Sequence, residues 1–174
     1  MNIETVTDLA VPQYPVVVPG VGPTRARGMI IGEAPGRNEV IQGIPFCGQS
    51  GEVLDEALEC AGTTRDEFFI TNVFKGDVGV GNKNPKSAQP ADHRGLLDQE
   101  VEDDVDLIGI LLLGRFATRA FIPACPRLGE LVGDKSDFEG IALFPCWHPA
   151  YTIRRPKLRP DFRRVVATFV AETE

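Results

Sequence analysis

The stretch that decides the fold is Gly28-Met29-Ile30-Ile31-Gly32-Glu33-Ala34-Pro35-Gly36. Its apolar run, 29–31, is typical of a short buried strand, and the residues after it mark a turn at the strand's carboxyl end. A second polar phrase, His148-Pro149-Ala150-Tyr151, follows the apolar run 141–144. Ligands bind outside the carboxyl ends of strands in open α/β sheets, so we expect Glu33 and His148 to face one pocket.

Apolar runs and helical patterns alternate along the chain. Strands are predicted at 28–31, 68–74, 107–113 and 141–144, and helices at 52–61, 92–104, 115–121 and 161–172. Ser50 is expected to cap the first helix and Gly62 to end it. This alternation predicts an α/β fold, a three-layer α/β/α sandwich with a central four-stranded, mainly parallel sheet.

The length of 174 residues suits a single domain, 1–174, with a core of its own. The first 27 residues contain Pro12, Pro15, Pro19 and Pro23 and are expected to form an extended N-terminal arm. The polar segment 76–90 is predicted to be a long loop, a length that usually serves function or mobility.

Composition narrows the class of protein. No apolar run approaches the roughly 18 residues that cross a bilayer, and the first residues resemble no signal peptide, so we expect no membrane partner and a cytoplasmic location. We also expect a monomer. The four cysteines are scattered without a Cys-x-x-Cys pair, and the two histidines have no metal-ligand spacing. Free thiols and no metal site are predicted.

Charge is distributed unevenly. The net charge of −7 argues against a general nucleic-acid binder, because phosphate contacts need lysine and arginine. Residues 154–164 nevertheless carry six cations and one acid, a net +5, so the rest of the chain carries −12. This basic segment begins six residues after His148. It is either a solvated helix face or a surface that contacts phosphates.

Four phrases carry a resemblance to a known family. They are 32–36 (GEAPG) with Glu39, 45–51 (PFCGQSG), 71–75 (TNVFK) and 148–151 (HPAY). In this order they resemble the motif series of the uracil-DNA glycosylase superfamily, and family four is the most similar. The resemblance runs from about residue 29 to 164. It implies cleavage of an N-glycosidic bond after a base is flipped out of the DNA stack.

That chemistry assigns expected roles to the pocket. Phe46 would stack on the flipped base, unless it is a core phenylalanine. Asn72 would donate to uracil O4 and accept from N3–H, a pattern that cytosine reverses, unless it is a turn or cap residue. Gly32 and Ala34 would line the same pocket.

The catalytic residues expected from the resemblance are Glu33, Glu39 and His148. His148 would donate to uracil O2 as negative charge develops on the leaving base. Either Glu33 or Glu39 would orient water or stabilise the cationic sugar, because Ala34 stands where another branch of the superfamily has an activating aspartate. Glu39 could instead close the pocket against a thymine methyl group.

DNA contacts are expected from two segments and one lysine. Gln49 and Ser50 open a helix whose free N–H groups favour a phosphate. Lys75 follows the second strand. Arg154, Arg155 and Lys157 lie where the family grips DNA near the lesion, and phosphate contacts there would weaken with salt. For each arginine a solvated surface position is the alternative.

The chain departs from family four in its cysteines. Those enzymes typically hold an iron-sulfur cluster on four cysteines, two of them in an N-terminal Cys-x-x-Cys. Here the arm has no cysteine, Gly76 stands at the third position and His93 at the fourth in an ungapped count. We therefore expect no cluster and no other cofactor.

The sequence thus predicts an enzyme that removes uracil from DNA and leaves an abasic site. Its partner would be DNA containing uracil or another modified base. Three alternatives stay open at this point: a glycosylase for another deaminated or hypermodified base, a catalytically weak DNA-binding protein of the same fold, and a plain nucleotide-binding domain.

Overall fold

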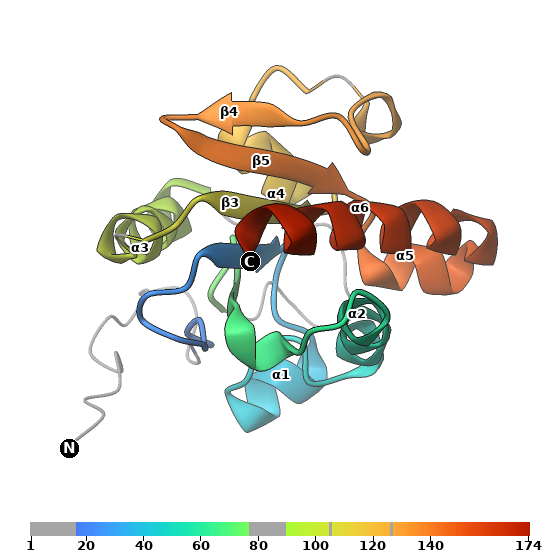
Figure 1. Cartoon of the computed structure of the whole chain (residues 1–174). Helices are drawn as coiled ribbons and strands as arrows, with labels where there is room; N and C mark the ends of the chain where they lie inside the picture. Colours follow the sequence, from blue (N-terminus) through green and yellow to red (C-terminus); the bar gives the residue numbers. More distant parts are fainter. Residues whose placement is uncertain (1–16, 77–89, 105, 126) are drawn as a thin grey trace.

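A five-stranded sheet forms the centre of the protein (Figure 1). The computed structural model describes residues 17–76, 90–104, 106–125 and 127–174. The strand order is β2-β1-β3-β5-β4. The strands are β1 Gly28–Gly32, β2 Phe69–Asn72, β3 Gly109–Leu113, β4 Ser136–Phe138 and β5 Ile141–Cys146.

The central strands are parallel, as the alternation of strands and helices predicted. β1 pairs with both β2 and β3, and β3 pairs with β5, all in parallel. Every residue of β1 and β3 is buried, as expected for strands covered on both faces. Their carboxyl ends therefore meet along one edge of the sheet.

The sequence predicted four strands, whereas the sheet has five. β4 pairs antiparallel with β5 at the rim of the sheet, and its three residues, Ser136, Asp137 and Phe138, are mostly exposed. A strand this short and polar contains no hydrophobic run, so the sequence pattern does not indicate it. β4 reaches only as far as Leu143, so β5 is an edge beyond that point and tolerates Pro145, which has no N–H to donate.

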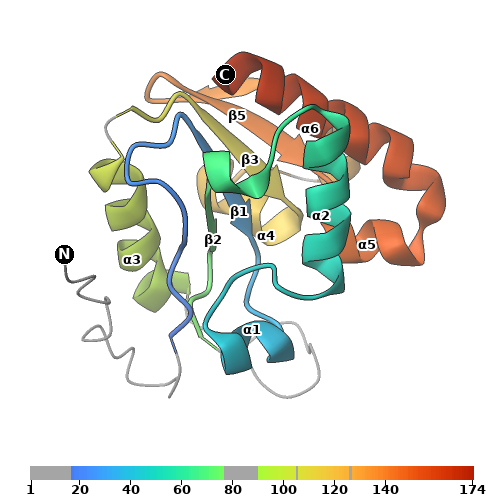
Figure 2. The same cartoon turned by 60° about the horizontal axis from the view of Figure 1, so that its bottom comes forward.

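Helices cover both faces of the sheet, which confirms the three-layer α/β/α sandwich (Figure 2). On one face α2, Gln49–Cys60, and α6, Arg159–Thr173, pack over a core that includes Ile30, Leu111 and Phe144. On the other face lie α3, Pro90–Asp103, and α4, Arg115–Phe121. Among the described residues no helix is long and apolar enough to cross a membrane.

Two short helices at the carboxyl edge were not predicted. They are α1, Arg37–Gln42, and α5, Pro149–Arg154. Six residues are too few for a helical hydrophobic pattern to repeat. The N-cap of α2 is Gly48 and the helix starts at Gln49, so Ser50 lies inside the first turn and the prediction that it caps the helix was wrong. Single 3₁₀ turns lie at Arg65–Glu67, Leu128–Glu130 and Pro156–Leu158.

The described part of the arm, 17–27, lies along β2. Isolated antiparallel bridges join Val17 to Gly76 and Val21 to Ile70. Residues 1–16, and 77–89 of the long loop, lie outside the described part of the chain.

Lys75 is buried beneath this arm, with 1% of its surface exposed. Its ammonium group donates to Thr71 Oγ1 and is ion-paired with Glu100 of α3, whose other oxygen accepts from the Gly20 N–H at 3.2 Å. Lys75 was predicted to contact DNA, but its burial and its ion pair with Glu100 argue against that contact, because its charge is engaged inside the domain. Burial lowers the pKa of Lys75, whereas Glu100 acts in the opposite direction.

We expect Lys75→Met to lower the free energy of unfolding by about 3 kcal/mol, because it leaves the Glu100 carboxylate without its cation. Urea denaturation followed by circular dichroism measures this change. Lys157→Met removes an exposed lysine and should change stability by less than about 0.5 kcal/mol. Equal effects of the two substitutions would contradict a structural role for Lys75.

Candidate active site

The carboxyl edge of the sheet brings together residues that are far apart in the sequence. Gly32 ends β1 in register with Asn72, which ends β2. A Cβ atom placed on Gly32 would overlap both the Asn72 side-chain oxygen and the Phe46 ring. The Phe46 and His148 rings lie 5.9 Å apart between centroids, at 31°. Four of the residues expected in the pocket therefore line one small site.

The Phe46 backbone is held in an uncommon conformation. Its φ is 55°, in the left-handed region that residues with a side chain seldom adopt. Its carbonyl accepts a hydrogen bond of 2.9 Å from Arg65 Nη2, and a Cβ atom on Gly51 of α2 would collide with that same carbonyl. Such strain persists only where the surroundings enforce it, and it is common at functional sites.

Glu39 of α1 supplies the remaining restraint on Phe46. One carboxylate oxygen accepts from the Phe46 N–H and the other accepts from the Gly36 N–H. Both oxygens are therefore engaged by backbone donors. This arrangement suits a brace between the two ends of segment 36–46, and it argues against Glu39 as the residue that orients water.

Asn72 is almost fully buried, with 2% of its surface exposed. Its Nδ2 has no hydrogen-bond partner among the described residues. A buried amide donor without a partner costs roughly 1–3 kcal/mol, so it marks a place where a ligand acceptor would fit.

His148 is the N-cap of α5. Its Nδ1 accepts a hydrogen bond of 3.2 Å from the Ala150 N–H, so the proton of the neutral ring lies on Nε2. Burial, and to a smaller extent the charge of Arg154, lowers the pKa of His148 to about 4. The ring is therefore a neutral hydrogen-bond donor at physiological pH. Gly114, with φ of 92°, packs directly behind it, since a Cβ atom there would lie 3.0 Å from the His148 Cβ.

Glu33 directly follows β1 and interacts electrostatically with Arg115 at the start of α4. Its carboxylate is partly buried, and burial raises its pKa while Arg115 at the start of α4 lowers it. No hydrogen bond joins this carboxylate to another described residue, in contrast to Glu39. Ala34, the next residue, packs against the core beneath α4.

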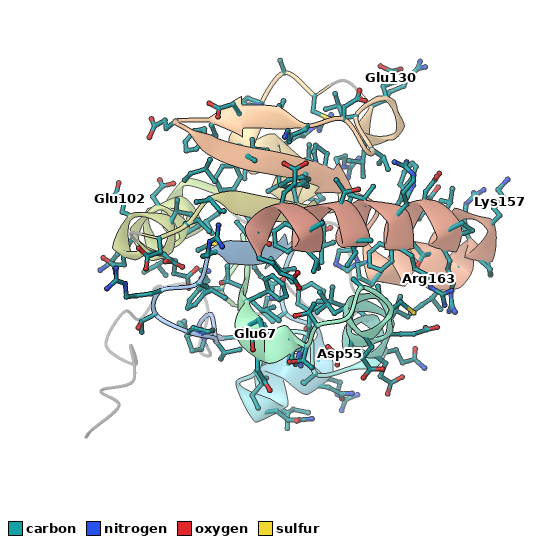
Figure 3. All side chains as sticks on the ribbon, in the orientation of Figure 1. Asp55, Glu67, Glu102, Glu130, Lys157 and Arg163 are labelled. Atoms are coloured by element: carbon teal, nitrogen blue, oxygen red, sulfur yellow. The ribbon has the colours of Figure 1, made fainter. Side chains whose placement is uncertain are left out.

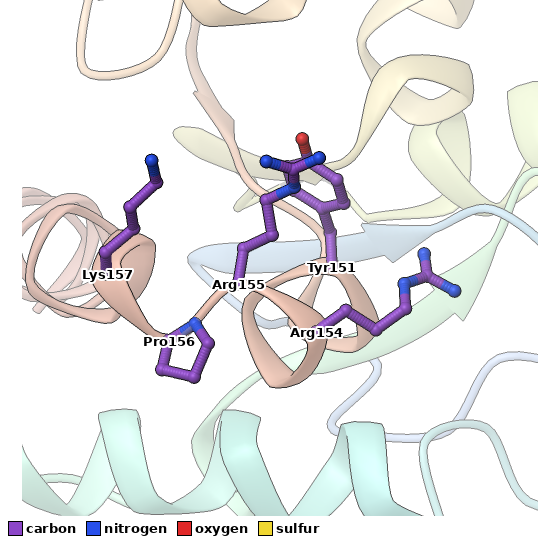
Figure 4. Close-up of a pocket in the computed structure, with 5 residues that line it drawn as sticks. All are labelled: Tyr151, Arg154, Arg155, Pro156 and Lys157. Carbon is purple, nitrogen blue, oxygen red and sulfur yellow. The ribbon is translucent and has the colours of Figure 1, made fainter.

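A basic depression lies beside the pocket, on α5 and the turn after it (Figure 4). It has a volume of about 540 Å³ and is lined by Tyr151, Arg154, Arg155, Pro156 and Lys157. The Arg155 guanidinium lies 5.6 Å from the centre of the Tyr151 ring. Figure 3 shows Lys157 at one end of the domain and the acidic Glu102 of α3 at the opposite end.

Gln49 and Ser50 lie in the first turn of α2, directly after the Phe46 turn. Gln49 is exposed and Ser50 is partly buried. Their N–H groups belong to a twelve-residue helix whose N-terminus opens toward the carboxyl edge, so the predicted phosphate contact remains a prediction with suitable geometry.

The cysteines do not fit an iron-sulfur cluster. All four are free thiols: Cys125 and Cys146 are buried, Cys47 is partly buried and Cys60 is exposed. Within the part of the chain that the structure describes, no group of three or more metal-ligating side chains occurs.

Three residues at this site were not predicted from the sequence. Arg65 follows α2 in an ordinary polar turn, and only the folded chain shows that it reaches Phe46. Gly114 and Arg115 follow the third apolar run directly, and that position after a parallel strand is the signal that could have identified them.

The protonation state of His148 is directly testable. In an NMR titration of the histidine rings we expect His148 to titrate at about pH 4, with its proton on Nε2 above that pH. A folded-state pKa below the ordinary value means that the ring stays neutral as pH falls from 7 to 5. A midpoint near pH 6.5, or a proton on Nδ1, would contradict this geometry.

Comparisons with known proteins identify the family of this chain. A sequence model of the uracil DNA glycosylase superfamily matches residues 19–170. A Type-4 uracil-DNA glycosylase from Pyrobaculum aerophilum is 34% identical over 170 residues, which cover 87% of this chain and 81% of that protein. One from Sulfurisphaera tokodaii is 32% identical, covering 85% and 72%, and one from Thermotoga maritima is 30% identical, covering 86% and 77%. The chain therefore belongs to the uracil DNA glycosylase superfamily.

Proposed function

We propose that the protein is a monofunctional DNA N-glycosylase that removes uracil from DNA and leaves an abasic site. The observation that carries this proposal is the buried, unpartnered Nδ2 of Asn72 beside the Phe46 ring. Relatives named uracil-DNA glycosylases, similar over most of the chain, support the same substrate. The pocket and the basic depression lie on one chain, and we propose that it acts as a monomer.

Asn72 selects the base by matching donors to acceptors. Uracil presents the O4 acceptor to Nδ2 and the N3–H donor to the amide oxygen. Cytosine presents an amino group and an unprotonated N3 at these places, so donor would face donor and acceptor would face acceptor. In a buried site each mismatch of this kind costs roughly 1–3 kcal/mol. Phe46 holds the base by stacking, and the absence of a side chain on Gly32 lets the Phe46 ring lie close to the Asn72 amide.

His148 stabilises the leaving base. As the glycosidic bond breaks, negative charge spreads onto uracil O2, and a neutral Nε2–H donor can bind that oxygen more strongly in the transition state than in the ground state. The backbone N–H of Ala150 and the packing of Gly114 fix the ring, so little reorganisation is needed during the reaction.

Glu33 is the carboxylate that serves the water and the cationic sugar. Its oxygens remain free of hydrogen bonds from described residues, whereas those of Glu39 are occupied by backbone N–H groups. Arg115 opposes the effect of burial and favours the charged form of Glu33. Glu39 is a positioning residue that acts through Phe46.

The strand that carries the uracil would cross the basic depression. Arg154, Arg155 and Lys157 are exposed and supply three cations for phosphates next to the flipped nucleotide. The first turn of α2, with Gln49 and Ser50, offers a further phosphate site on the other side of Phe46.

The base preference can be measured with oligonucleotides that each carry one uracil, hypoxanthine, xanthine or cytosine, followed by alkaline cleavage of abasic sites. We expect uracil to be released from single and double strands. Asn72→Asp should lower the ratio of uracil to cytosine release by about tenfold or more, because the donor to O4 is lost. DNA binding without release of any base would contradict the proposed activity.

Substitution of Glu33 and of Glu39 should affect different properties of the enzyme. We expect Glu33→Gln to lower kcat by about a hundredfold with unchanged stability, because it removes a charge that acts in the reaction. Glu39→Gln should mainly raise KM and lower the free energy of unfolding by about 1–2 kcal/mol, because an amide cannot accept from both N–H groups.

Single-turnover kinetics and urea denaturation of both variants give these values. Glu52→Gln, an exposed acid in the first turn of α2, is the control for loss of one negative charge. A larger loss of kcat in Glu39→Gln than in Glu33→Gln would reverse the assignment.

A further inference from the structure

The segment 36–46, which ends at Phe46, carries two exposed isoleucines. Ile41 is 72% exposed and Ile44 is 42% exposed, the highest values for large hydrophobic side chains in the described part of the chain. They flank Gly43, the C-cap of α1, so both belong to one turn. Neither has been assigned a role in binding or catalysis.

This turn is fixed to the pocket although it packs little against the domain. α1 has no buried residue, and in Figures 1 and 2 it stands out beyond the ends of the strands. The Glu39 carboxylate joins the two ends of the segment through Gly36 and Phe46, and the Gly43 N–H donates to the Glu39 carbonyl at 2.7 Å. The Glu39 carboxylate, which positions the Phe46 ring, therefore also holds the turn that carries the two exposed isoleucines.

The surroundings of the turn suit a polyanion. The exposed neighbours are Arg37, Asn38 and Gln42, and the one acid of α1 has both oxygens engaged by backbone donors. The rest of the surface is largely acidic, since the net charge is −7 despite the basic segment 154–164. α1 and α5 lie at the same edge of the sheet, beyond β1 and β5 respectively (Figure 2).

We propose that Ile41 and Ile44 form an apolar wedge that contacts the base pairs beside the flipped nucleotide in double-stranded DNA. The inference rests on the proposed function and adds a role in the choice of substrate. Flipping a base from a duplex breaks stacking and pairing, and apolar side chains placed against the opened step offset part of that cost. A single strand has no partner strand to open and needs the wedge much less.

The test compares the double variant Ile41→Ser/Ile44→Ser with the unaltered protein on one uracil-containing sequence, as a single strand and as a duplex. We expect kcat/KM to fall about tenfold on the duplex and less than about twofold on the single strand. Ile41→Leu should keep the duplex activity. Ile108→Ser is the matched control, because Ile108 is 37% exposed and precedes β3 at the opposite end of the strands.

Binding supplies a second readout that needs no chemistry. By fluorescence anisotropy, the double variant should bind a duplex with one abasic site about tenfold more weakly and an abasic single strand normally. Unchanged activity and binding on the duplex would overturn the proposal and leave the turn as a surface for a protein partner. Equal losses on both substrates would also overturn it, because the turn would then only support the pocket. Absence of uracil release by the unaltered protein contradicts the proposed function, and the binding ratio still decides the wedge.

Discussion

The close approach of the Phe46 turn to two glycines is the constraint on which the pocket depends. Gly51 leaves room for the Phe46 carbonyl, and Gly32 leaves room for its ring against Asn72. Glu39 and Arg65 then bind the N–H and the carbonyl of the same residue. Without these contacts a left-handed phenylalanine would relax, and the ring on which we propose that the base stacks would lose its position.

Rigid surroundings fix the direction of the hydrogen-bond donors in the pocket. Asn72 ends a buried strand, and His148 is fixed by its own helix cap, so both donors keep their direction before substrate arrives. Donors that are already oriented cost little reorganisation during reaction. The two glutamates differ in the same respect. Both Glu39 oxygens accept from backbone N–H groups, whereas the Glu33 oxygens accept no hydrogen bond from a described residue, which suits the role in the reaction that we propose for Glu33.

The layers and several residues of the candidate pocket could be predicted because they follow from local sequence patterns, namely the apolar runs of the strands and the polar phrases at their carboxyl ends. The apolar runs at 29–31 and 141–144 located β1 and β5, and the polar phrases after them located Glu33 and His148. Long-range contacts carry no such local signal. The burial of Lys75 depends on Glu100, which is 25 residues away in the sequence, and Arg65 reaches Phe46 over 19 residues. α1 is too short for a periodic pattern, so the exposure of Ile41 in this helix and of Ile44 after it became visible only in the fold.

A crystal structure of the protein with duplex DNA that carries a hydrolysis-resistant 2′-fluoro-deoxyuridine tests the central claim most directly. We expect the uracil ring to stack on Phe46, with O4 accepting from Asn72 Nδ2 and O2 accepting from His148 Nε2. Ile41 and Ile44 should lie against the base pairs beside the extruded nucleotide. A uracil bound elsewhere, or an Asn72 amide turned to a partner within the protein, would contradict the assignment of this pocket.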